Sequence, residues 1–144
     1  TKPKQPCFQA RPSGAISNIN VGSSQTLNLA TEVFDLNADY DTSNYTFTAP
    51  VTGKYLLTLN LRVQALDING SYFQGLITTS NRSYQSILST NRFSADPSYW
   101  YVVLSVIADM DASDTAIPQV YISSDSAAQV DIDTDSYFSG CLLA

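Results

Sequence analysis

Histidine is absent from this 144-residue sequence, and charged residues account for only 14% of it. Without histidine, serine-triad hydrolysis, histidine-assisted cysteine chemistry and zinc hydrolysis lose the residue that usually serves as general base or metal ligand. We therefore expect a protein that is not an enzyme. Ordinary globular domains carry about 25% charged residues, and here serine, threonine, asparagine and glutamine supply most of the polarity instead. This composition is typical of secreted proteins and of β proteins on a virion surface, so we expect an extracellular or virion-surface location.

Basic residues are also scarce, because 7 Lys and Arg stand against 13 Asp and Glu, which gives a formal charge of −6. The basic residues are scattered, so no nucleic acid or anionic membrane is expected as a partner. No run reaches the length of about 18 apolar residues that a membrane-spanning helix needs, so we expect no membrane insertion. We expect residues 7–144 to form one domain and residues 1–6 to be a linker or the end of an upstream stalk.

Strand signals dominate the sequence. Residues 54–64 alternate with period two, and their apolar face carries Tyr55, Leu57, Leu59, Leu61 and Val63. Further runs rich in β-branched and aromatic residues lie at 31–34, 45–48, 71–79, 83–90, 99–108, 119–123, 129–132 and 137–143. Turn-forming residues separate these runs, and this arrangement predicts an all-β sandwich or barrel.

The run at 99–108 departs from simple alternation because it is apolar on both faces. Tyr99, Tyr101, Val103 and Ile107 share one face, while the other face carries Trp100, Val102, Leu104, Val106 and Ala108. An antiparallel sheet in a monomeric sandwich usually keeps one face in water. Either a neighbouring subunit or a loop of the same chain must therefore cover the second face, and the subunit is the more economical explanation in so short a chain.

Three segments resemble a known family. Residues 47–63, FTAPVTGKYLLTLNLRV, are similar to the F-x-A-P-x-x-G-x-Y-x-F/L segment of the globular head of complement C1q, a member of the tumour-necrosis-factor-like superfamily. Residues 7–11, CFQAR, resemble the family's opening F-x-A-R strand, and residues 137–143, YFSGCLL, resemble its closing F-S-G-F-L-L strand. The three matches occur in the family's order and span essentially the whole chain.

This resemblance implies a ten-strand jelly-roll sandwich that assembles as a homotrimer. Aligned with the family's pattern, the core would receive Tyr55, Leu57, Leu59, Leu61, Val102, Leu104 and Val106, and the trimer axis would be lined by Leu56, Tyr101, Val103, Ile107 and Phe138. Two features depart from the family: Cys141 stands where the family usually has phenylalanine, and no collagen-like repeat precedes Pro6. Trimerisation would then depend on the head itself or on another kind of stalk.

The two cysteines, Cys7 and Cys141, lie almost at opposite ends of the sequence. The resemblance implies that the first and last strands are adjacent, which would bring the two residues to neighbouring positions. Both a disulfide and a pair of free, half-buried thiols are compatible with the sequence.

Two groups of acidic residues could supply oxygen ligands for calcium, which would be the only cofactor. Asp131, Asp133 and Asp135 alternate and would share one face of an extended strand, and Asp109, Asp111 and Asp114 form a second acidic turn. The first series is not an EF-hand, because it has Ser136 and Leu142 where that loop needs Gly and Glu. The alternative is that these acids are solvated and keep the protein soluble and its strand edges unpaired.

Aromatic residues in polar surroundings could also have either a binding role or an ordinary structural role. Exposed rings beside amides and carboxylates can bind sugars, whereas the alternative is ordinary strand packing; the residues concerned are Tyr40, Tyr45, Tyr72, Phe73, Tyr84, Phe93 and Tyr99. The sequence therefore predicts a non-catalytic trimeric head that binds a cell-surface or virion protein or a glycan multivalently. A capsid decoration or cementing protein and a secreted trimeric ligand or lectin are the alternatives.

Overall fold

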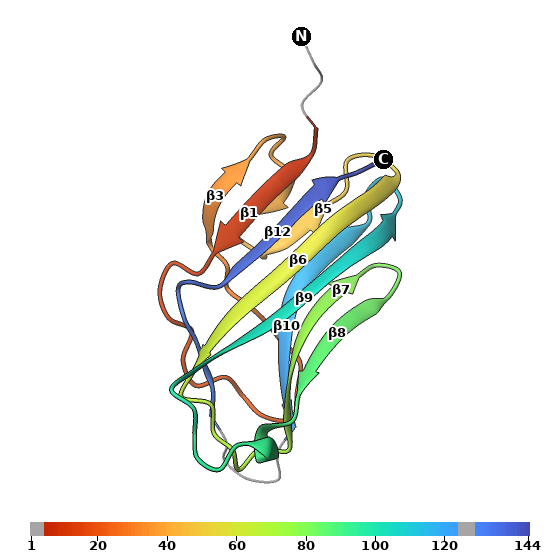
Figure 1. Cartoon of the computed structure of the whole chain (residues 1–144). Coiled ribbons are helices and arrows are strands. Elements are labelled where there is room, and N and C mark those ends of the chain that lie inside the picture. The colour runs from red at the N-terminus through yellow and green to blue at the C-terminus, as the bar shows by residue number, and fades with distance from the viewer. Residues whose placement is uncertain (1–4, 124–128) are drawn as a thin grey trace.

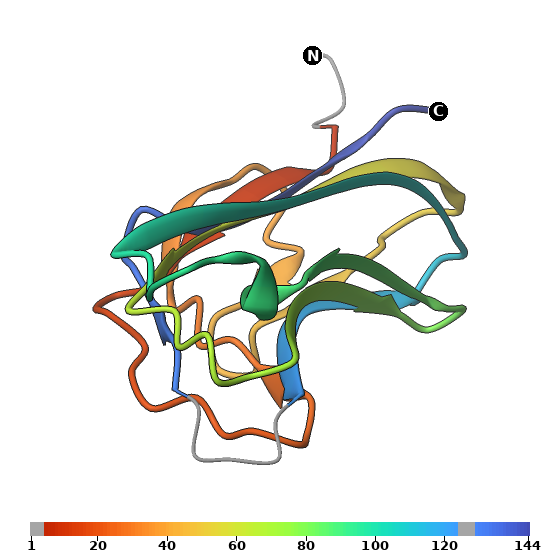
Figure 2. The same ribbon diagram turned by 60° about the horizontal axis from the view of Figure 1, so that its bottom comes forward.

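Two antiparallel sheets packed face to face form the computed structural model, which describes residues 5–123 and 129–144. Figure 1 looks onto the first sheet, and Figure 2 shows the two layers from a second direction. The first sheet has the order β11-β6-β12-β1-β3, with β9 along the free side of β6. Its strands are β1 (Cys7–Arg11), β3 (Thr31–Asp35), β6 (Gly53–Gln64), β9 (Tyr99–Met110), β11 (Asp131–Ile132) and β12 (Tyr137–Leu142).

The second sheet has the order β4-β5-β10-β7-β8, with β2 also paired to β10. Its strands are β2 (Gln25–Thr26), β4 (Tyr40–Asp41), β5 (Thr46–Thr48), β7 (Tyr72–Thr79), β8 (Ser83–Leu88) and β10 (Thr115–Ser123). Each strand run predicted from the sequence has a counterpart, and the jelly-roll sandwich is confirmed. The described residues form twelve strands against the ten expected, and three of them, β2, β4 and β11, are only two residues long.

Helical structure is limited to one 3₁₀ turn, η1 (Thr90–Arg92), within the described part of the chain. No helix among these residues has the length and apolar character needed to span a bilayer.

The core lies between the sheets and is built by the predicted alternation. Tyr55, Leu57, Leu59 and Leu61 of β6 are fully or almost fully buried. An aromatic cluster fills one end of the core: the ring of Phe8 stacks on that of Phe47 at 4.6 Å between centroids and meets that of Phe138 edge-on at 5.1 Å. Such ring pairs stabilise a core beyond the area they bury.

Gly140 allows the last strand to pass close to this cluster. A Cβ atom at this position would lie 2.6 Å from a ring carbon of Phe8 and 2.8 Å from a methyl carbon of Leu57. Because β12 alternates, Phe138 shares the inward face with Gly140. The ring of Phe138 and the space left by Gly140 therefore belong to the same layer of the core.

Candidate functional site

The outward side of the first sheet is the most unusual surface of the molecule. We call it the outer face and define it by the side chains of β1, β3, β12, β6 and β9 that point away from the core. No described segment crosses it in Figure 1. Six large hydrophobic side chains are exposed on it: Phe34, Leu56, Tyr99, Tyr101, Val103 and Ile107. A contiguous apolar surface of this kind marks an interaction site in a water-soluble domain.

Strand register brings these residues together. Cys7 lies opposite Cys141, Cys141 opposite Leu56, and Leu56 opposite Ile107, so one row of outward side chains crosses four strands. A second row contains Asn60 and Val103 as direct neighbours. β9 is an edge strand rather than a central one, and within the described residues no loop covers its outer side.

Four of the five residues predicted to line a trimer axis lie on this face. Leu56, Tyr101, Val103 and Ile107 are 38%, 52%, 51% and 62% exposed in the single chain. The prediction for Phe138 is wrong, because its side chain is completely buried in the core. A shift of one residue reverses the direction of every side chain of a strand, and in β12 it is Tyr137, Ser139 and Cys141 that point outward.

Polar atoms on the outer face also lack partners. Among the described residues, three buried side-chain atoms make no hydrogen bond: Nε of Arg11, Oδ1 of Asn60 and Nε of Arg62. All three belong to outward residues of β1 and β6. Each of these atoms is already enclosed by its own chain, so it is the exposed apolar side chains that mark the face as an interaction surface.

Arg62 forms ion pairs with two of the three acidic residues of the first group, Asp133 and Asp135. Its guanidinium lies 2.6 Å from Oδ2 of Asp133 and 2.6 Å from Oδ2 of Asp135, and it stacks over the ring of Tyr99 at 4.9 Å from the centroid. The hydrogen bond with Asp133 raises the pKa of Arg62 further above its already high value. Arg62 therefore stays protonated, and the carboxylates of Asp133 and Asp135 neutralise its charge. It is not available at this position as a cation for another acid.

The acidic groups are not assembled into calcium sites. Arg62 binds Asp133 and Asp135, whereas Asp131 accepts a hydrogen bond from the backbone N–H of Asn18, at 3.2 Å. In the second group, Oδ2 of Asp114 accepts hydrogen bonds from Asn81 and from the backbone of Asp111, while Asp109 pairs with Arg82. Across residues 5–123 and 129–144, no three Asp, Glu, Cys or His side chains lie close enough together to hold a metal ion.

Acidic pH should weaken the ion pairs of Arg62 with Asp133 and Asp135. The backbone N–H of Asp135 and, after it, the guanidinium of Arg62 hold the pKa of Asp133 below its usual value. A carboxylate with a lowered pKa in the folded state contributes stability above its unfolded pKa of about 4, and this contribution is lost as the pH falls below that value. We expect Asp133→Asn to flatten the decline of the melting temperature between pH 5 and pH 2. Asp111→Asn, which removes an exposed acid without an ion pair, is the matched control, and an equal effect of both variants would contradict the assignment.

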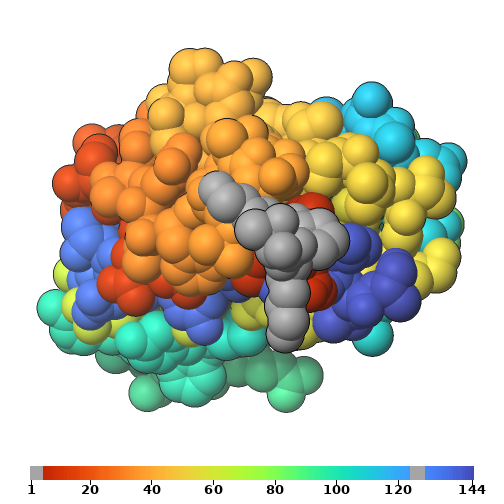
Figure 3. Space-filling model, turned by 90° about the horizontal axis from the view of Figure 1, so that it is seen from above, coloured from red at the N-terminus to blue at the C-terminus, as the bar shows by residue number. Residues whose placement is uncertain are grey.

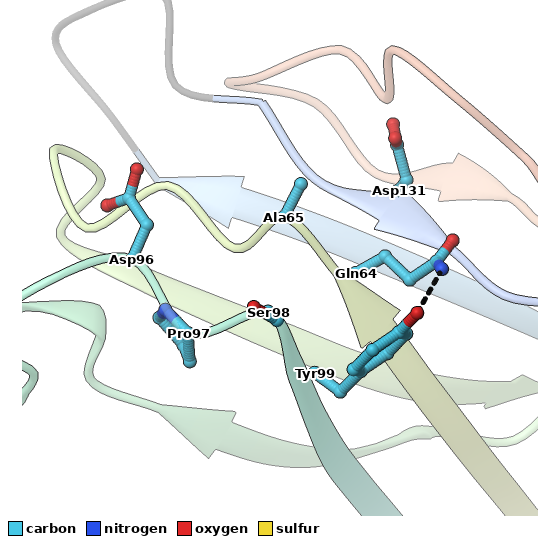
Figure 4. Close-up of a pocket in the computed structure, with 7 residues that line it drawn as sticks. All are labelled: Gln64, Ala65, Asp96, Pro97, Ser98, Tyr99 and Asp131. Atoms are coloured by element: carbon cyan, nitrogen blue, oxygen red, sulfur yellow. Dashed lines mark hydrogen bonds between the residues drawn. The ribbon is translucent and has the colours of Figure 1, made fainter.

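A polar pocket of about 510 Å³ opens where β6 ends and β9 begins (Figure 4), which is the end of the molecule away from the termini in Figure 1. We call it the distal pocket; it is lined by Gln64, Ala65, Asp96, Pro97, Ser98, Tyr99 and Asp131. The side-chain amide of Gln64 donates a hydrogen bond to the hydroxyl of Tyr99 at 3.4 Å. Its two carboxylates make the pocket repel anions, and its amide, hydroxyl and carboxylate groups can bind hydroxyl groups of a ligand.

Some of the aromatic residues considered for sugar binding are buried in the core, and at least one is exposed at the distal pocket. Tyr40 and Phe73 are buried in the core, which is the packing role. Tyr99 is 54% exposed and lines the distal pocket beside Gln64. Sequence reasoning did not find the pocket itself, because its walls come from three segments that are distant along the chain.

Cys7 and Cys141 lie directly opposite one another on β1 and β12, and both are free thiols in the structure. The adjacency that the resemblance implied is therefore confirmed. The disulfide remains a prediction.

The fold and its outer face define a jelly-roll domain of the C1q and tumour-necrosis-factor type. No family model and no curated protein matches the sequence. Solved structures match the fold across nearly the whole chain. The globular domain of zebrafish complement 1qA has a TM-score of 0.70 at 14% identity and covers 97% of this chain and 98% of its own.

Two other similar structures are tumour-necrosis-factor-like. The Eiger TNF from S. frugiperda has a TM-score of 0.70 at 12% identity, with 99% of this chain and 94% of its own covered. Murine APRIL has a TM-score of 0.66 at 11% identity, with 97% and 100% covered. At these identities the similarity establishes the C1q/TNF-like fold.

Proposed function

We propose that this chain is the non-catalytic head of a homotrimer in which the outer faces of three copies turn towards a common axis. The observation that carries the proposal is the outer face itself, which exposes Leu56, Val103 and Ile107. Burial of such a surface against identical copies would remove apolar area from water. The lack of histidine supports a role without catalysis.

In this proposal the trimer caps or decorates a larger extracellular or virion assembly and binds a surface partner. Both ends of the described chain lie at the same end of the domain (Figure 1), so a stalk joined through residues 1–6 would leave the distal pocket free. Figure 3 looks onto the end that holds the termini, where the last residues of the chain lie beside the loops that follow β3 and β5. An apolar pocket of about 450 Å³ lies there, lined in part by Pro6, Val51 and Leu143.

Three identical distal pockets on one rigid particle would act together. A weak interaction at each pocket gains avidity when the partner presents a repetitive surface, without any new contact. The groups that line the pocket suit hydroxyl-rich ligands, and a glycan on a cell surface is therefore the partner that the proposal favours over a protein.

Native mass spectrometry of the isolated chain at micromolar concentration tests the assembly. We expect a single species of three times 15.7 kDa. The physical reason is that the outer face exposes more apolar surface than an ordinary monomer keeps in water. A monomer at this concentration would overturn the proposal.

The partner is tested separately, with a glycan array and with empty shells of a candidate virion. Selective glycan binding that Tyr99→Ala abolishes while native mass still shows the trimer supports recognition through the distal pocket. Binding to empty shells alone would favour the alternative, a capsid decoration or cementing protein. A trimer that binds glycans but no assembly would favour the second alternative, a secreted trimeric ligand or lectin.

A further inference from the structure

We infer that Cys7 and Cys141 are the two halves of a cross-strand disulfide that ties the first strand of the domain to its last. The two residues lie directly opposite one another in the antiparallel pair of β1 and β12. The bond is an intramolecular covalent modification, and it would close a loop that contains almost the whole domain.

The backbone hydrogen bonds show which kind of opposing pair this is. The N–H of Leu142 donates to the carbonyl oxygen of Pro6 at 2.9 Å, and Pro6 and Leu142 are the next pair along the two strands. Hydrogen-bonded and non-hydrogen-bonded pairs alternate along an antiparallel ladder, so the cysteines occupy a non-hydrogen-bonded pair. Cα atoms in such a pair are about 4.5 Å apart, which lies within the range of about 4.4 to 6.8 Å that disulfides span.

The side chains of Cys7 and Cys141 also lie on the same face of the sheet, as a disulfide requires. Both cysteines point to the outer face and are half-buried. Together with Phe34, Leu56 and Ser139 they line a shallow depression of about 150 Å³ on that face. The strand pairing therefore already gives the backbone separation that a disulfide needs.

The same surroundings determine how the bond can form. Burial, followed by the neighbouring Cys141 thiol, raises the pKa of Cys7 to about 11. Few thiolates are therefore present at neutral pH, and the pair needs an exchange partner of the small-molecule disulfide class, such as oxidised glutathione. One cysteine thiolate attacks a sulfur of that disulfide and releases one thiol. The second cysteine then displaces the other, so that the protein loses two hydrogen atoms and two small thiols are formed.

The position of the pair also sets an order of events, and this part rests on the proposed trimer. Cys141 is adjacent to Leu56 in the row that leads to Ile107, which is the surface that three copies would cover. The disulfide would have to form before assembly, and the assembled particle would shield it from reductants. The bond itself does not depend on the trimer.

The experiment uses the full chain, equilibrated with oxidised glutathione, unfolded in denaturant, treated with iodoacetamide and measured by intact mass. We expect the loss of two hydrogen atoms, no alkylation, and a proteolytic peptide that joins Cys7 to Cys141. A reductant added to the unfolded chain before refolding should lower the melting temperature by about 10 °C or more, because the bond closes a long loop.

The double variant Cys7→Ser/Cys141→Ser is the matched control and should melt at one temperature with and without reductant. Two alkylated thiols, or a stable adduct with glutathione on either cysteine, would overturn the inference. Native mass spectrometry of the same samples reports the trimer independently. A monomer that carries the disulfide would therefore contradict the proposed trimer and leave the disulfide inference intact.

Discussion

Replacing Val103 by Asp is expected to abolish the trimer at concentrations where the unaltered chain is fully assembled. Val103 is 51% exposed on the outer face of the single chain, opposite Asn60. In a lone domain the new carboxylate would stay in water. Between three copies it would lose its water, and the guanidinium of Arg62, two residues along β6 from Asn60, is already paired with Asp133 and Asp135.

The expected effect is large because an unpaired buried charge costs several kcal/mol and each trimer would contain three. Every 1.4 kcal/mol is about a factor of ten in an equilibrium constant, so assembly should fall by orders of magnitude. Native mass spectrometry and the melting temperature together give the result. Val103→Asp is consistent with a buried interface if native mass spectrometry shows a folded monomer, and also if the variant does not fold because it cannot assemble.

Ile87→Asp provides the matched control for this prediction. Ile87 is 54% exposed, but it lies on β8 in the second sheet. The same gain of charge at nearly the same exposure should leave the trimer intact. If Val103→Asp also yields a trimer of unchanged stability, the outer face is not the interface.

Much of the first sheet could be predicted because its strands follow simple periodic rules. The alternation in β6 places Leu57 and Leu59 inside, and the doubly apolar β9 exposes Val103 and Ile107, as the residues imply. One strand start was missed: β10 begins at Thr115 rather than at 119. Pro118 reads as a break, yet it pairs within the strand and uses only its carbonyl, which accepts a hydrogen bond from the N–H of Leu27 at 2.9 Å.

The direction of β12 was predicted incorrectly because aromatic residues stand at both parities, Tyr137 and Phe138. A signal was present in Gly140, whose missing side chain makes room for Phe8 and which has the same parity as Phe138. A glycine that allows close packing belongs on the core side of a strand. That rule alone would have placed Phe138 in the core.

The candidate site was less accessible to sequence reasoning because it depends on contacts between distant residues. The spacing of Asp133 and Asp135 resembles a ligand series, but Arg62, about 70 residues earlier, binds both. The distal pocket likewise joins Gln64, Asp96 and Asp131, which come from three segments that are distant along the chain. Local patterns determine which way a side chain points, whereas the partner that it meets depends on the complete fold.

The corrected position of Phe138 leads to the second large effect. Phe138→Ala should reduce the free energy of unfolding by about 3 to 5 kcal/mol, the usual consequence of removing a buried phenylalanine ring. The side chain is fully buried and contacts the rings of Phe8 and Tyr40 edge-on, at 5.1 Å and 6.5 Å between centroids. Equilibrium denaturation at one fixed protein concentration measures the loss, since the stability of an oligomer depends on concentration.

Leu56→Ala is the control that separates the core from the outer face. Leu56 is 38% exposed and lies on the adjacent strand β6, with its side chain pointing outward. Its truncation should weaken assembly and leave the stability of the dissociated chain nearly unchanged, whereas Phe138→Ala should destabilise the dissociated chain as strongly as the trimer. If instead Phe138→Ala acts only on the trimer, its ring faces the axis and the register of β12 is the opposite of the one described. The two truncations therefore test the direction of β12 and the location of the interface at the same time, because Leu56→Ala should act on the trimer alone whereas Phe138→Ala should act on both states.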